Sequence, residues 1–345
     1  MISLLSAAFA SWLLVLAPGA AQAATPWQVE GVHRDHGSGS GEPGFEGVVT
    51  FGDSLSDPGN AFVATGDFVV RPFDPIPDAP YLIGGFRFSN GPTWIEWLTR
   101  DLGLRRSGRP ALLLPGIYTN YAVGAARART EGPVDLATEI DLFLKDFDGD
   151  APPDMLYVLW IGSNDLRDAL AALEDDPTGG ATVAIITEAV EATKNGIIDL
   201  VVAGADSFLV LNLPNVAITP AINTQDPDVQ FFAEFFSEQY NAGLELVLLG
   251  LEARLGITIA RLDVFAILND AVADPASVGL INVTDSCITP GVIIGAVCRR
   301  PNTYLFWDFI HPTTQAHRLL SEEAEGSLEA TFDGVAPAAP LVSAR

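Results

Sequence analysis

The chain has 345 residues, which suffices for one large α/β domain or two small ones. Its 44 acidic residues outnumber the 18 basic ones, and the net charge is −26. Such a surface repels nucleic acid, whose binding depends on basic contacts to phosphate, and it disfavours docking on anionic lipid. We therefore expect no nucleic-acid partner and attribute the acidity to solubility.

The N-terminus has the layout of a secretory signal peptide. Residues 1–23 hold no charged side chain, include the apolar run Leu13-Leu14-Val15-Leu16, and end in Ala21-Gln22-Ala23. This layout predicts cleavage after Ala23 and a secreted or periplasmic protein. The alternatives are a buried N-terminal helix and a membrane anchor, but a spanning helix needs roughly 20 apolar residues and Pro18-Gly19 interrupts this run early. No later stretch resembles a span, so we expect no stable membrane anchor.

The rest of the chain predicts one domain between two irregular ends. Residues 24–46 are polar and Gly-rich, which is typical of a flexible lead-in. Residues 333–345 are rich in Pro and Ala and predict a disordered tail. No repeat and no long linker divides residues 47–332, so these are expected to form a single domain.

Short apolar runs alternate with long helical patterns along this domain. The runs are nearly all apolar, as in strands that are covered on both faces of a parallel sheet. We expect strands at residues 47–51, 155–161, 207–211 and 257–262. We expect long helices at residues 182–203, 228–255 and 313–330. This alternation predicts an α/β fold, a three-layer α/β/α sandwich whose active site lies outside the carboxyl ends of the strands.

Two polar motifs directly follow predicted strands. Gly52-Asp53-Ser54-Leu55 follows the first, where a glycine-containing turn exposes a serine hydroxyl and backbone N–H groups can face a developing anion. Gly162-Ser163-Asn164-Asp165 follows the second. Taken singly, the first motif is also compatible with a helix cap and the second with an ordinary turn.

A third motif places a carboxylate three residues before an imidazole, in Asp308-Phe309-Ile310-His311-Pro312. A serine hydroxyl is a weak nucleophile until a base takes its proton, and histidine is the base suited to neutral pH. The carboxylate can hold the imidazole tautomer and stabilise the imidazolium. Among the other histidines, His33 and His36 lie in the expected lead-in and His317 lies inside an expected helix. His311 is therefore the best candidate base.

Together with Asn120-Tyr121-Ala122-Val123-Gly124, these motifs resemble the four sequence blocks of the GDSL/SGNH hydrolases, in the family's order over residues 51–312. The resemblance implies the SGNH-hydrolase, flavodoxin-like fold and a catalytic triad of Ser54, His311 and Asp308. It also implies an acyl-enzyme on Ser54 and no metal or organic cofactor.

The same resemblance implies an oxyanion hole. Its donors are the backbone N–H groups of Ser54 and Gly124 and the side-chain amide of Asn164. Many members have a second glycine after the one matched by Gly124, whereas this chain has Ala125. Without the resemblance, the segment around Gly124 is also compatible with close packing of small residues.

Two cysteines, Cys287 and Cys298, lie near the C-terminus. Two cysteines that close a short loop in an exported chain predict a disulfide. A zinc site is not expected, because neither cysteine has a His or Cys partner at the usual spacing.

The sequence thus predicts a secreted serine esterase or lipase acting on ester or lipid substrates. The alternatives are an acyltransferase to a lipid alcohol, a polysaccharide acetylesterase, and a non-catalytic binding module on the same fold. Arg87, Phe88 and Trp94 are candidates either for lining an acyl pocket or for core packing. The sequence leaves the acyl chain length, the alcohol and the oligomeric state open.

Overall fold

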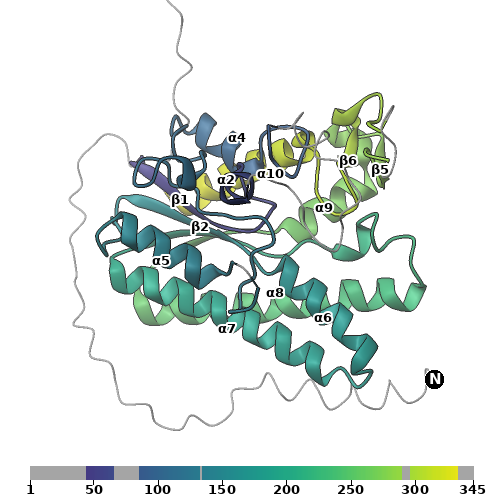
Figure 1. The fold of residues 1–345 in the computed structure, drawn as a ribbon, viewed down its shortest axis with the longest axis horizontal. Helices are drawn as coiled ribbons and strands as arrows, with labels where there is room; N and C mark the ends of the chain where they lie inside the picture. Colours follow the sequence, from purple (N-terminus) through teal and green to yellow (C-terminus); the bar gives the residue numbers. More distant parts are fainter. Residues whose placement is uncertain (1–43, 66–84, 133, 290–295, 333–345) are drawn as a thin grey trace, which may run out of the picture.

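The computed structural model describes residues 44–65, 85–132, 134–289 and 296–332 (Figure 1). The predicted signal peptide, the tail and most of the lead-in lie outside these ranges. Phe45, near the end of the expected lead-in, packs edge-on against Phe332, which follows the last helix. The described part contains all three motifs and the segment around Gly124.

The core of the fold is a parallel sheet of β1 (Gly47–Gly52), β2 (Met155–Trp160), β3 (Ser207–Leu211) and β4 (Thr258–Leu262), in that spatial order. Every predicted strand is present, with ends that differ from the prediction by at most a residue. All residues of β1 are buried, as are all of β2 except the first. Burial on both faces explains why the sequence of these strands is continuously apolar rather than alternating.

A further segment of chain lies along the free edge of β1. Asn120 forms a parallel bridge with Thr50, and the Tyr121 and Val123 N–H groups donate to the carbonyls of Thr50 and Gly52. This segment therefore occupies the position of a strand on one side of β1, whereas β2 lies on the other. The result is the strand order of flavodoxin-like folds, with the second strand reduced to a bridge, and the order reverses at β1.

Helices cover both faces of the sheet and make the predicted three-layer sandwich (Figure 1). One face packs against α5 (Leu136–Asp146), α6 (Ser163–Asp175), α7 (Gly180–Ala203) and α8 (Pro227–Leu255). The other packs against α4 (Trp94–Asp101), α9 (Val264–Ala273) and α10 (Thr314–Thr331). The three predicted long helices correspond to α7, α8 and α10. Val49 and Val48 of β1 belong to opposite cores, as the two-residue period of a strand requires.

Shorter elements connect the layers. They are α2 (Asn60–Thr65), the 3₁₀ helices η2 (Ala111–Leu113), η3 (Val216–Ile218), η4 (Pro275–Val278) and η5 (Pro301–Thr303), and the paired strands β5 (Asn282–Ser286) and β6 (Tyr304–Phe306). None of the helices within the described ranges combines the length and the apolar composition that a bilayer crossing requires.

The predicted disulfide between Cys287 and Cys298 is confirmed. It lies beside the chain that leads to Asp308, because the Cys287 and Ile288 N–H groups donate to the carbonyls of Phe306 and Trp307. Cys287 and Trp307 are buried in one small apolar cluster. The cross-link therefore supports the segment that carries the third motif.

The turn between β2 and α6 requires a residue without a side chain at position 162. Gly162 has a φ of +118°, and a Cβ there would lie 2.4 Å from the hydroxyl oxygen of Tyr240, which donates to the Ile161 carbonyl. We predict that Gly162→Ala lowers the free energy of unfolding by about 2–4 kcal/mol, from backbone strain and the clash. Chemical denaturation measures this change.

Gly250→Ala is the matched control, because Gly250 lies inside α8 and a Cβ there meets nothing within 4 Å. Alanine is the better helix former, so this variant is expected to gain about 0.5–1 kcal/mol. Equal stability of the two variants would show that the turn at Gly162 tolerates a side chain.

Candidate active site

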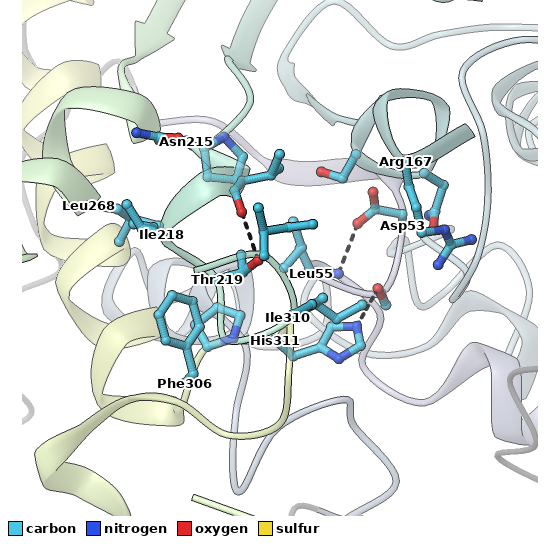
Figure 2. A pocket seen from close by; sticks show the side chains of 18 of the residues that line it. Asp53, Leu55, Arg167, Asn215, Ile218, Thr219, Leu268, Phe306, Ile310 and His311 are labelled. Carbon is cyan, nitrogen blue, oxygen red and sulfur yellow. Dashed lines mark hydrogen bonds between the residues drawn. The ribbon is translucent and has the colours of Figure 1, made fainter. Parts of the chain in front are cut away.

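Three side chains predicted from separate motifs form one hydrogen-bonded chain. Ser54 Oγ lies 2.8 Å from His311 Nε2, a bond drawn as the dashed line at the His311 ring in Figure 2. His311 Nδ1 lies 2.7 Å from Asp308 Oδ2. Ser54 follows β1, whereas Asp308 and His311 lie on the loop between β6 and α10. A hydroxyl bound to an imidazole that a carboxylate holds is the arrangement of an activated nucleophile.

The loop at Asp308 is built around its carboxylate. Oδ1 accepts the backbone N–H groups of Ile310 and His311, while Oδ2 binds the imidazole. The Trp307 N–H donates to the His311 carbonyl and closes the loop. Burial opposes ionisation of Asp308, but the imidazole and the two N–H groups outweigh it and hold the pKa below its usual value. Asp308 is therefore an anion beside the imidazole at neutral pH.

The turn that carries Ser54 is held by the residue before it. Asp53 Oδ1 accepts the Leu55 N–H, and the Asp53 carbonyl accepts the Ser56 N–H. The carboxyl of Asp53 is buried, and burial raises its pKa to about 7. The short local bonds leave Ser54 just after β1, with its hydroxyl hydrogen-bonded to His311 Nε2.

Gly124 lies beside α2, and its backbone N–H is engaged. It donates to Asp57 Oδ2 at 2.8 Å, and Asp57 also accepts the N–H groups of Gly59, Asn60 and Ala61. Ala125 has a φ of +70°, a left-handed conformation that favours glycine. Ala125 thus has a glycine-like backbone conformation at the position where many family members have a second glycine.

Asn164, at the first turn of α6, faces the same cavity as Ser54 and His311. Its amide nitrogen donates to the Ala126 carbonyl at 2.9 Å, which ties α6 to the loop after Gly124. An amide nitrogen carries two hydrogens, so this bond leaves one for another acceptor. The structure therefore brings Asn164 to the nucleophile, whereas Gly124 is not among the residues that line the cavity.

The cavity beside Ser54 has a volume of about 260 Å³ and a largely apolar lining. Its walls comprise Asp53–Leu55, Trp160, Ser163, Asn164, Arg167, Leu170, Pro214–Val216, Ile218, Thr219, Ala221, Ile222, Leu268, Phe306 and Ile310–Pro312. Residues 214–222 follow β3, and sequence reasoning did not assign them to the site. The same rule that placed the first two motifs, a polar loop after a buried strand, points to this loop as well.

The three candidates for an acyl pocket lie elsewhere. Trp94 is wholly buried, donates to Ser56 Oγ and packs edge-on against Trp160. Phe88 is buried against the outer side of the site, with its ring 5.2 Å from that of His311. Arg87 forms an ion pair with Glu96. The alternative of core packing is therefore the correct one for Trp94 and Phe88.

Within the described residues, no group of three or more His, Cys, Asp or Glu side chains is placed to hold a metal ion.

Comparison with known proteins gives the family. Residues 48–324 match the model of the GDSL-like lipase/acylhydrolase family. The chain belongs to this family. The sequence resemblance is thereby confirmed, and with it an esterase- or lipase-type hydrolase as the broad class.

Similar proteins come from bacteria and plants. A phosphatidylcholine-sterol acyltransferase of Aeromonas hydrophila is 25% identical, over 85% of this chain and 93% of its own length. A thermolabile hemolysin of Vibrio parahaemolyticus is 25% identical over 80% of this chain, which spans only 62% of the hemolysin. GDSL esterase/lipase 6 of Arabidopsis thaliana is 25% identical, over 80% of this chain and 84% of its own.

One residue of this GDSL-family site was missed by sequence reasoning. Glu139 of α5 is buried, and its two carboxyl oxygens accept the N–H groups of Gly52 and Val123. Gly52 precedes the nucleophile turn, and Val123 precedes Gly124. A single side chain thus joins the two loops. The available signal was an acidic residue within the apolar stripe of Leu136, Ile140 and Phe143, whose helical spacing directs it inward.

Burial raises the pKa of Glu139 well above its usual value, although the two N–H bonds lower it. Nearby Asp53 and Asp57 raise this pKa further. We predict that Glu139→Gln lowers kcat about tenfold, because the amide cannot accept both backbone N–H groups and one loop loses its anchor. Steady-state hydrolysis of a short-chain ester measures this effect.

The control is Asp141→Asn, an exposed acid on the same helix, which is expected to keep wild-type kcat. If Glu139→Gln also keeps wild-type kcat, the carboxyl does not position the two loops.

Asp53 makes stability depend on pH. Its folded pKa of about 7 exceeds the ordinary 3.8, so the stability from its neutral form is fully present below about pH 4 and is lost as the pH rises through 7. Asp53→Asn keeps an acceptor for the Leu55 N–H and cannot ionise. We therefore predict that this variant loses less stability than wild type between pH 4 and 7, by a few kcal/mol.

Urea denaturation at a series of pH values gives both slopes, with Asp141→Asn again as the control. Identical slopes for wild type and Asp53→Asn would place the titrating group elsewhere.

Proposed function

We propose that this protein is a secreted serine esterase or lipase that hydrolyses carboxylic esters through an acyl-enzyme on Ser54. The supporting observation is the continuous hydrogen-bonded chain from Ser54 through His311 to Asp308. Ser54, at one end of this hydrogen-bonded chain, lines a cavity whose apolar lining suits an acyl group.

Acylation begins when Ser54 Oγ attacks the ester carbonyl carbon and His311 Nε2 takes its proton. In the tautomer with a proton on Nδ1, that N–H donates to Asp308, and the lone pair of Nε2 faces Ser54. The anionic carboxylate then stabilises the imidazolium. His311 returns the proton to the leaving alkoxide, and a water activated by the same imidazole hydrolyses the acyl-enzyme.

Charge develops on the carbonyl oxygen during both steps. The Ser54 N–H and the second amide hydrogen of Asn164 are our proposed principal donors. Gly124 is the third, and there the oxyanion competes with Asp57, which holds this N–H in the resting enzyme. The carboxyl of Asp57 is shared among three other N–H groups, so release of Gly124 leaves it bound.

An acyltransferase is the second candidate, since the relative from Aeromonas hydrophila bears that name. The first half-reaction is the same, and an alcohol replaces water in the second. Product analysis with a sterol or long-chain alcohol present distinguishes the two, because a transferase converts the acyl group into a new ester.

The complete triad argues against a non-catalytic module. A cavity of about 260 Å³ is larger than an acetyl group requires, which argues against an acetylesterase. The proposal of secretion rests on the composition of residues 1–23. Sequencing the N-terminus of the exported protein tests it.

The test of the proposed function is Ser54→Ala. We predict that it lowers ester hydrolysis by at least about 10⁴-fold and abolishes labelling by a fluorophosphonate, because only the nucleophile is removed. The thermal midpoint is expected to stay near that of wild type. Ser207→Ala, at the start of β3 and away from the cavity, serves as the control and retains both activities. A label found by mass spectrometry on a serine other than Ser54 would refute the assignment.

A further inference from the structure

The cavity beside Ser54 has two chemically different sides. One side carries the charged groups of the lining, Asp53 after β1 and Arg167 of α6 (Figure 2). Across the cavity from Asp53 and Arg167 lie Ile218 and Leu268 (Figure 2). Asn215 and Thr219 lie beside Ile218, but their side chains are hydrogen-bonded within the protein. A substrate bound at Ser54 therefore meets charged groups in one direction and mainly hydrocarbon in the other.

The apolar side is backed by the packed interior. Leu268 of α9 and Phe306 at the end of β6 are 4% and 2% exposed, and both belong to the core between the sheet and α10. Ile218 of η3 packs against the same core. An extended hydrocarbon chain that enters on this side meets a wall of buried side chains, which limits its length.

The alcohol and the acyl group of a cleaved ester leave the site at different times. The alcohol must leave and water must replace it while the acyl group is still bound to Ser54. An apolar recess suits the part that stays, and the polar side suits the part that exchanges with water. The recess at Ile218 and Leu268 is thus the place of the acyl chain.

Its volume sets the length of that chain. An apolar protein cavity of about 150 Å³ accommodates benzene, which corresponds to about 25 Å³ per carbon atom. On this scale the whole cavity of about 260 Å³, which also encloses the ester group at Ser54, holds about ten carbon atoms, so ten is the upper limit for an acyl chain within it.

We propose that the enzyme selects medium-chain acyl groups of about 8–10 carbons, and that Ile218 and Leu268 set the upper limit. The inference rests on the proposed function, because it places the chain on an acyl-Ser54. Methylenes beyond that length stay in water or displace packed side chains, so they add nothing to binding or weaken it.

The experiment is an internal competition. An equimolar mixture of vinyl esters with even acyl chains from C2 to C16, in mixed micelles of fixed composition, is hydrolysed to low conversion. Mass spectrometry of the released fatty acids gives the ratios of kcat/KM, which are independent of the amount of folded enzyme. From C4 to C8 the ratio is expected to rise about fourfold per methylene. It peaks at C8–C10 and falls at least about tenfold by C16.

Two variants move the limit in opposite directions. Leu268→Ala removes about three carbons from the wall and is expected to shift the optimum to longer chains by a similar length. Ile218→Phe adds about three carbons and is expected to shift it to shorter chains. Ile267→Ala is the control, because Ile267 lies on α9 in the same core but not on the cavity, and it keeps the wild-type optimum. If Leu268→Ala does not fold, Ile218→Ala carries the same expectation.

The outcomes separate the two proposals. Wild-type enzyme that hydrolyses no ester in the mixture overturns the proposed function and this inference with it. Hydrolysis without chain preference, or with kcat/KM still rising at C16, overturns this inference alone. An optimum at C8–C10 that neither Leu268→Ala nor Ile218→Phe moves overturns the role of these two residues.

Discussion

The reversal of strand order at β1 places the three loops that carry Ser54, Asn164 and Gly124. The segment around Asn120 lies on one side of β1 and β2 on the other, so the loops after β1 and β2 and the loop at Gly124 diverge from one point. Such a point is where open α/β sheets bind ligands. Ser54 follows β1 directly, and its partner His311 is 257 residues away in the chain. The loop of His311 follows β6, which pairs with β5 outside the four-stranded sheet, so the 2.8 Å contact depends on the packing of Leu305 and Phe306 in the core beside that sheet.

Buried carboxyl groups fix the loops that the sheet brings together. Glu139 joins the ends of the Gly52 and Val123 segments, and Asp57 joins Gly124 to the first turn of α2. Burial raises the pKa of three acids near Ser54, namely Asp53, Asp57 and Glu139, although backbone N–H bonds lower it in each case. Asp308 is the exception, because the imidazole it binds outweighs burial. A carboxyl group therefore holds backbone N–H groups at all four positions, and at Asp308 it also binds the imidazole.

The parts of the fold that follow from local pattern were predictable from the sequence, and the parts that depend on long-range contact were not. Continuous apolar runs identified the four strands of the main sheet, and helical periodicity identified α7, α8 and α10, because burial constrains each residue of these elements. The motifs at Ser54, Asn164 and His311 follow strands or precede a helix, so the topology implied their meeting. The bonds of Glu139 join residues 87 and 16 positions away, and no local pattern specifies such partners. The wall at Ile218 and Leu268 likewise consists of ordinary apolar residues whose role comes from the cavity they face.

The loop at Gly124 shows how a departure from the family pattern is absorbed. Ala125 adopts the left-handed backbone that a second glycine would adopt freely, at a cost of about 1–2 kcal/mol for a residue with a Cβ. The surrounding contacts hold it there: Asp57 accepts the Gly124 N–H on one side, and Asn164 donates to the Ala126 carbonyl on the other. The Gly124 N–H is therefore held by the Asp57 carboxyl group before substrate binds. In the proposed mechanism an oxyanion at Ser54 has to compete with Asp57 for this N–H, while the other N–H groups bound to Asp57 keep the loop in shape.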